Sequence, residues 1–80
     1  MAVENIRGAI EAILFANGAS VEFSRIAQAL EISEKKVKEH ISALIDDYEV
    51  SGRGITIILL DNSCQMVSKK EFAPQIRTVM

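Results

Sequence analysis

The most constraining feature of this sequence is a pair of apolar runs at helical spacing with only a short turn between them. The first run comprises Phe23, Ile26, Ala27 and Leu30. The second run falls on a narrow arc of a helix and comprises Val37, Ile41, Leu44, Ile45 and Tyr48. Ser33 precedes the second run and is a favourable N-cap residue. The pattern predicts helices over about residues 22–30 and about residues 34–50, arranged as a helix-turn-helix unit.

Another helical run precedes this unit. Its members recur at helical spacing and are Val3, Ile6, Ile10, Ile13 and Leu14. Gly18 follows them and is the residue type that most often ends a helix. The spacing predicts a first helix over about residues 4–17.

The apolar pattern changes after Gly52-Arg53-Gly54, whose glycines permit a sharp turn. Apolar and β-branched residues then occupy positions 55–60, which favours a strand. Asp61-Asn62-Ser63 supplies turn residues before a second apolar segment at 64–68. The two segments predict a β-hairpin.

Pro74 is tolerated in the first turn of a helix, where its missing N–H has no intrahelical partner, so a last helix is expected over about residues 70–80. The order of elements predicts an α+β fold, mainly α: a winged helix-turn-helix with three helices, a two-stranded β-hairpin wing and a C-terminal helix. Residues 1–80 are expected to form a single domain. No C-cap or breaker follows the last helix at Met80, which suggests the N-terminal domain of a longer protein.

The second helix of the helix-turn-helix unit is too acidic for a typical DNA reader. Its three lysines are Lys35, Lys36 and Lys38. Five carboxylates oppose them, namely Glu34, Glu39, Asp46, Asp47 and Glu49. Because DNA-binding proteins gain affinity by neutralising phosphates with Lys and Arg, we expect a protein partner and no sequence-specific binding of nucleic acid. The alternative is a winged-helix transcriptional regulator in which the three lysines contact DNA.

Side chains suited to catalysis or metal binding are few. His40 is the only histidine and Cys64 the only cysteine, so a single chain can form neither an internal disulfide nor a Cys-based zinc site. No glycine-rich phosphate loop or nucleophile elbow occurs. The sequence predicts a non-enzymatic protein without a cofactor or metal. A weaker alternative is the accessory domain of an enzyme whose catalytic part follows Met80.

Neither a membrane span nor a secretory signal is visible in the sequence. No apolar run approaches the ~20 residues that cross a bilayer. Glu4 and Arg7 interrupt the apolar residues at the N-terminus, where a signal peptide would need an apolar stretch. A cytoplasmic protein without membrane contact is expected.

Two groups of residues are candidates for a dimer interface. Gly8, Ala12 and Phe15 lie opposite the main apolar stripe of the first helix, where small residues allow another helix to approach closely. Ile58 and Leu60 form the second face of the hairpin, and the hairpin register decides whether Met66 joins them. The alternative for both groups is packing within the domain, with the last helix covering the strands and the second helix covering Phe15.

Several short segments, in their order and spacing, resemble the segregation and condensation protein B family. They are Glu11-Ala12-Ile13-Leu14-Phe15-Ala16 with Gly18, Val21, Arg25-Ile26-Ala27 with Leu30, Ile32-Ser33, Gly52-Arg53-Gly54-Ile55, Gln65-Met66-Val67-Ser68-Lys69 and Phe72-Ala73-Pro74. The chain departs from the family at Ser20 and Glu31, where Pro and Gly are expected, and its wing tip has no Gly. These departures lie in turns, and the resemblance still extends over nearly the whole chain.

The resemblance implies a subunit of the bacterial condensin complex, in which dimers of a two-winged-helix protein bind a kleisin that bridges the SMC ATPase heads. In that family the N-terminal winged helix serves mainly in homodimerisation, and the C-terminal one does much of the kleisin binding. The chain is therefore expected to be a homodimerising, nucleoid-associated module for chromosome condensation and segregation. Contact with the kleisin and the SMC ATPase complex would come through the full-length protein.

Overall fold

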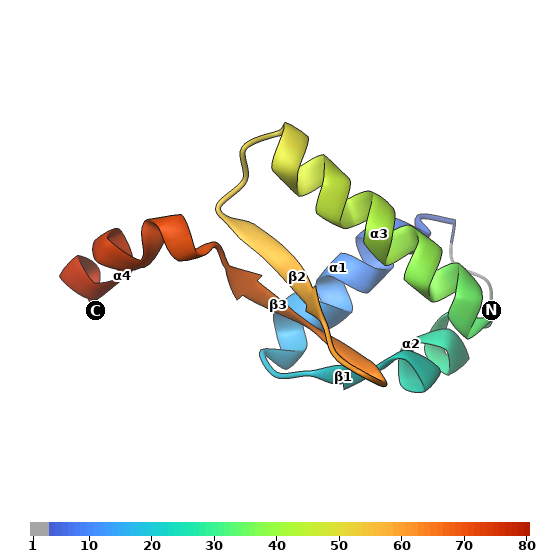
Figure 1. Ribbon diagram of the computed structural model, residues 1–80. Helices are drawn as coiled ribbons and strands as arrows, with labels where there is room; N and C mark the ends of the chain where they lie inside the picture. The colour runs from blue at the N-terminus through green and yellow to red at the C-terminus, as the bar shows by residue number, and fades with distance from the viewer. Residues whose placement is uncertain (1–3) are drawn as a thin grey trace.

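The computed structural model describes residues 4–80 and has the winged-helix arrangement (Figure 1). Its helices are α1 (Ile6–Asn17), α2 (Phe23–Leu30), α3 (Glu34–Val50), a 3-10 helix η1 (Lys70–Phe72), and α4 (Ala73–Val79). Its strands are β1 (Val21–Glu22), β2 (Ile55–Leu59) and β3 (Ser63–Ser68). The predicted fold class is confirmed. Val3, which was assigned to the first apolar run, lies outside the described residues.

The ends of the first and third helices are set by local capping. α1 begins at Ile6 rather than at residue 4 because Asn5 is its N-cap, with Oδ1 accepting from the Gly8 N–H at 2.9 Å. Gly18 ends the helix in the left-handed conformation, with φ 73°. Ser33 caps α3, and its Oγ accepts from the Lys36 N–H at 3.1 Å. The N-cap predicted at Ser33 and the stop predicted at Gly18 are both confirmed.

The predicted hairpin wing is present as β2 and β3, and the short strand β1, which was not predicted, adds a third strand to the sheet. The sheet is antiparallel in the order β1-β3-β2, with Val21 opposite Cys64 and Glu22 opposite Ser63. Glu22 has extended backbone angles, so α2 begins at Phe23 rather than at residue 22. At the hairpin turn the Leu60 N–H donates to the Ser63 carbonyl at 2.8 Å. β2 therefore ends at Leu59, one residue earlier than predicted, and β3 begins at Ser63 instead of residue 64.

The core lies between the first three helices and one face of the sheet. Its least exposed side chains are Ile10, Leu14, Ile26, Ile41, Val37 and Cys64. Ile57 is the one buried residue of β2, with an exposed fraction of 4%, and it packs with the side chains from α3. The next two residues of β2, Ile58 and Leu59, are 41% and 57% exposed, which leaves apolar surface on the sheet.

The C-terminal segment projects away from this core. Where a continuous helix over 70–80 was predicted, the chain forms η1 and then α4, with Pro74 in the first turn of α4. None of the residues of η1 or α4 is buried. Figure 1 shows α4 extending away from the end of the sheet, consistent with molecular extents of 42 × 23 × 22 Å. We call residues 70–80 the arm. The alternative in which the last helix covers the strands is therefore wrong.

Candidate protein-protein interface

An apolar groove lies between α1 and the sheet. It has a volume of about 290 Å³ and is lined by Gly8, Glu11, Ala12, Phe15, Ile55 and Met66. We call this surface the α1 groove. Phe15 is 79% exposed, so α2 does not cover it as the packing alternative required. The structure thus brings the three residues predicted on the reverse side of the first helix together with two residues of the hairpin.

Met66 belongs to the α1 groove and not to the opposite face of the hairpin. In the β2–β3 ladder Met66 stands opposite Ile57, which points into the core, whereas Ile58 stands opposite Gln65. Directly opposed residues of an antiparallel pair share one face of the sheet. The register therefore places Met66 and Ile58 on opposite faces of the sheet. The sequence alone had left open whether they share a face.

The Asn5 side chain at the start of α1 leaves no room for a side chain at position 8. A Cβ at Gly8 would lie 2.6 Å from Asn5 Nδ2, which is closer than real Cβ atoms approach a heavy atom. The Asn5 side chain occupies this space because it caps α1. Gly8 therefore contributes backbone to the α1 groove, and Ala12 and Phe15 supply the apolar side chains.

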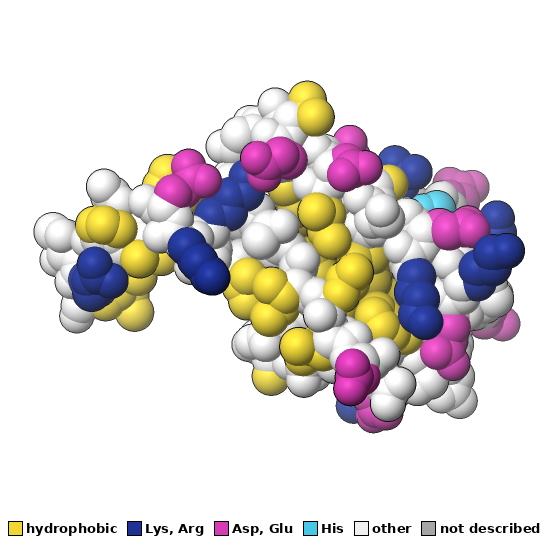
Figure 2. Space-filling view, in the orientation of Figure 1, with side chains coloured by type: hydrophobic (Ala, Val, Ile, Leu, Met, Phe, Trp, Pro, Cys, Tyr) yellow, Lys and Arg dark blue, Asp and Glu magenta, His cyan; other side chains and the backbone are white. Residues whose placement is uncertain are grey.

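The other face of the sheet carries the second candidate surface. Ile58 is 41% exposed and Leu60 47% exposed. Beside them lies a depression of about 380 Å³, lined by Glu49, Thr56, Ile58, Val67, Ser68, Lys69, Lys70 and Glu71. We call Thr56, Ile58, Leu60 and Val67 the outer sheet face. Figure 2 shows hydrophobic side chains gathered over the sheet beside α3, with charged side chains around them.

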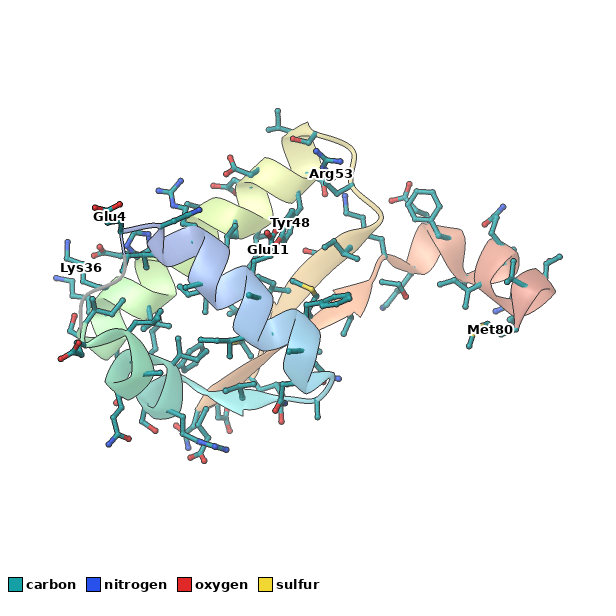
Figure 3. All side chains as sticks on the ribbon, turned by 180° about the vertical axis from the view of Figure 1, so that it is seen from behind. Glu4, Glu11, Lys36, Tyr48, Arg53 and Met80 are labelled. Carbon is teal, nitrogen blue, oxygen red and sulfur yellow. The ribbon has the colours of Figure 1, made fainter. Side chains whose placement is uncertain are left out.

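A hydrogen bond between α1 and α3 fixes the wall of the α1 groove. The Tyr48 hydroxyl donates to Glu11 Oε2 at 2.5 Å, and Figure 3 shows these two side chains pointing toward one another between the helices. Burial raises the pKa of Tyr48 well above its usual value, and the Glu11 carboxylate raises it further. The hydroxyl therefore stays protonated and keeps donating to Glu11, the one charged residue that lines the groove.

The second tie lies at the C-terminal end of α3. Lys69 Nζ donates to the Tyr48 carbonyl at 3.2 Å and lies 3.4 Å from Glu49 Oε2. The Lys69 side chain is only 11% exposed. The Tyr48 carbonyl also accepts from the Arg53 N–H at 2.9 Å, so Lys69 adds a second hydrogen bond at the end of the helix. Lys69 therefore holds the base of the arm against α3.

The lysines proposed as DNA contacts are partly engaged within the domain. Lys38 Nζ lies 5.2 Å from the centre of the Phe23 ring, a cation–π distance. Lys36 Nζ lies 3.6 Å from Glu39 Oε1. Lys35 is exposed. Acidic and basic side chains alternate on this part of the surface in Figure 2, so no continuous basic patch forms there.

The single cysteine and the single histidine lie outside both surfaces. Cys64 is fully buried, and burial raises the pKa of its thiol to about 11. His40 is half-buried and its Nδ1 accepts from Arg7 Nε at 3.3 Å. Within residues 4–80 no group of three or more His, Cys, Asp or Glu side chains is placed to hold a metal ion. None of the helices in this described part is long and apolar enough to cross a membrane.

The arm carries exposed apolar residues that the sequence reasoning did not assign to an interface. Phe72, Ile76, Val79 and Met80 are all exposed. Their spacing of three and four residues was visible in the sequence and is typical of one side of a helix. That this side would face solvent was not visible, because exposure depends on where the arm lies relative to the core.

Comparison with known proteins identifies the family. The family model for segregation and condensation complex subunit ScpB matches residues 8–80. Segregation and condensation protein B of Agathobacter rectalis is 46% identical over 68 residues, covering 84% of this chain and 36% of that protein. The protein of the same name from Lachnoclostridium phytofermentans is 44% identical over 71 residues, covering 89% and 38%. The chain thus spans well under half the length of these curated relatives.

Solved structures agree with the sequence comparison. A crystal structure of a dimer of the ScpB N-terminal domain complexed with ScpA peptide superposes with a TM-score of 0.85 at 35% identity, covering 92% of this chain and 93% of that chain. ScpB from Mycobacterium tuberculosis superposes with a TM-score of 0.88 at 19% identity, covering 99% of this chain and 49% of that chain, and shows the shared fold. The resemblance noted in the sequence is confirmed, and the chain belongs to the ScpB family of segregation and condensation complex subunits.

Proposed function

We propose that this chain is a non-enzymatic interaction module for bacterial chromosome condensation and segregation, which pairs with a second copy of itself. One observation carries the proposal: two apolar surfaces, the α1 groove and the outer sheet face, stay open in the single chain. Exposed apolar surface in a small domain marks a place where another protein binds. A related N-terminal domain at 35% identity crystallised as a dimer complexed with ScpA peptide, which supports pairing here.

The proposal extends to partners and location. As the dimerising part of a longer subunit, the chain would bind the kleisin ScpA and, through it, the SMC ATPase complex, in the cytoplasm at the nucleoid. The candidate contact residues for the dimer remain Gly8, Ala12, Phe15, Ile58, Leu60 and Met66. The names of the relatives favour this module over a transcriptional regulator.

Sedimentation equilibrium of the 80-residue chain tests the pairing. We expect a monomer–dimer equilibrium in the micromolar range, which Phe15→Lys and Ile58→Lys each weaken by about tenfold or more because each would desolvate a charge in an apolar contact. Val50→Lys is the matched control, because Val50 is an exposed apolar residue (89%) at the end of α3 and outside both surfaces as we define them. Circular dichroism shows whether each variant stays folded.

Two results would contradict the proposed function. One is a wild-type chain that stays monomeric up to several hundred micromolar. The other is a dimer whose association constant responds equally to Val50→Lys and to the two surface substitutions, since this would mean that added charge alone weakens pairing.

A further inference from the structure

In the described part of the chain, residues 4–80, the arm leaves apolar side chains exposed. Ile76, Val79 and Met80 stand three and four residues apart and therefore lie on one side of α4. All three are exposed, Val79 and Met80 almost completely. Figure 3 shows Met80 at the far end of the arm, away from α1.

A helix as short as α4 needs tertiary contacts to be stable. Isolated helices shorter than about 12–15 residues are marginal in water, because nucleation costs more than a few hydrogen bonds return. α4 has seven residues, and its side-chain hydrogen bond from Thr78 Oγ1 to the Pro74 carbonyl is local to the helix. A surface outside this copy of the chain would supply the missing contacts.

The base of the arm fixes its direction. The Lys69 N–H donates to the Gly54 carbonyl at 2.8 Å. The Phe72 ring lies over Gly54, so that a Cβ there would be 3.8 Å from Phe72 Cδ2. These contacts point α4 away from the core, and Figure 1 shows it extending away from α1 of its own chain.

The arm and the α1 groove lie at the same end of the sheet. Ile55 lines the groove and pairs with Ser68, two residues before η1. A two-fold axis beside this end would therefore bring the arm of each copy to the groove of the other. The charges also match, because Glu11 is the one charged residue in the groove and Arg77 follows Ile76 in α4.

We propose that two copies of this chain pair by exchanging arms: α4 of each copy packs Ile76, Val79 and Met80 into the α1 groove of the other, with Arg77 near Glu11. This inference rests on the proposed function, because it assigns contacts to the dimer proposed there. It explains why the groove is apolar and why the arm leaves the core with its apolar side uncovered.

Disulfide trapping tests the exchange directly. Two variants are prepared in a Cys64→Ala background, one with Ala12→Cys in the groove and one with Ile76→Cys on the arm. Mixing them under mild oxidation is expected to give a covalent dimer of twice the 8.8 kDa chain mass, in higher yield than either variant alone. Thr78→Cys in place of Ile76→Cys is the control, because it lies on the opposite side of α4 and should trap poorly.

Sedimentation supplies the second measurement. Ile76→Lys is expected to weaken association by about tenfold or more, whereas Thr78→Lys, with the same charge on the same helix, should leave it within about twofold. A wild-type dimer that gives no mixed disulfide and is indifferent to Ile76→Lys would overturn arm exchange and leave the proposed function standing. A monomeric wild type would overturn both. A chain carrying both Ala12→Cys and Ile76→Cys that oxidises within one copy, at monomer mass, would also overturn the exchange.

Discussion

At the scale of a single residue, Cys64 makes the free energy of unfolding depend on pH in the alkaline range. Its thiol is fully buried, with Sγ 3.9 Å from the Val21 carbonyl oxygen. Burial raises the pKa of the thiol from 9.0 to about 11, because desolvation penalises the thiolate. Between these two pH values the folded thiol keeps a proton that the unfolded thiol loses. The free energy of unfolding therefore falls as the pH rises through this window, and it is unaffected by the thiol below it.

The effect of Cys64 is measurable by comparison with Cys64→Ala. We expect the thiol to account for a loss of about 2 kcal/mol in unfolding free energy between about pH 8 and about pH 11. Urea titrations of both proteins across this range measure it. Other groups titrate there in both proteins, so the thiol is isolated by the difference between the two pH slopes. Parallel slopes would mean that the thiolate is tolerated in the folded chain.

At the scale of an element, the stability of the start of α1 depends on the Asn5 side chain, which would compete for space with any side chain introduced at Gly8. Asn5 caps the helix and fills the position that a Cβ at Gly8 would take. Ala is favoured over Gly inside a helix by about 1 kcal/mol, and a lost N-cap costs about 1 kcal/mol. Gly8→Ala should therefore be nearly neutral in the wild type but stabilising by about 1 kcal/mol when Asn5→Ala is already present. A double-mutant cycle by urea unfolding measures this coupling, and simple additivity would show that Asn5 yields without cost.

The elements differ in how far the sequence could predict them. The helices were predictable because apolar spacing and caps such as Ser33 are properties of neighbouring residues. β1 was not, since two residues carry no periodicity and the strand exists through its pairing with Ser63 and Cys64 far along the chain. The α1 part of the candidate site was predicted from helical spacing. The face on which Met66 lies was not, because it depends on the hairpin register.

At the scale of the whole molecule, the distribution of charge predicts negligible affinity for DNA. The chain has a formal net charge of −2, and Lys36 and Lys38 are engaged by Glu39 and Phe23. We expect a dissociation constant for a duplex oligonucleotide weaker than about 100 μM near physiological salt, measured by fluorescence anisotropy. Replacing Lys35, Lys36 and Lys38 by Ala should change nothing. Binding that falls steeply with added salt and is lost in the triple variant would instead favour the transcriptional regulator.

Lys69 has a consequence for the size of the assembly. Its side chain joins the base of the arm to the end of α3, at the same Tyr48 that holds Glu11 in the wall of the α1 groove. The positions of the arm and of the groove wall are thus both fixed by contacts with the C-terminal end of α3. When both copies present their contacts across a two-fold axis, the assembly closes at two, whereas a head-to-tail contact forms a larger ring if its rotation closes and an open filament if it does not. Under arm exchange, the direction that the Lys69 contacts give to the arm would therefore help to set the number of copies in the assembly.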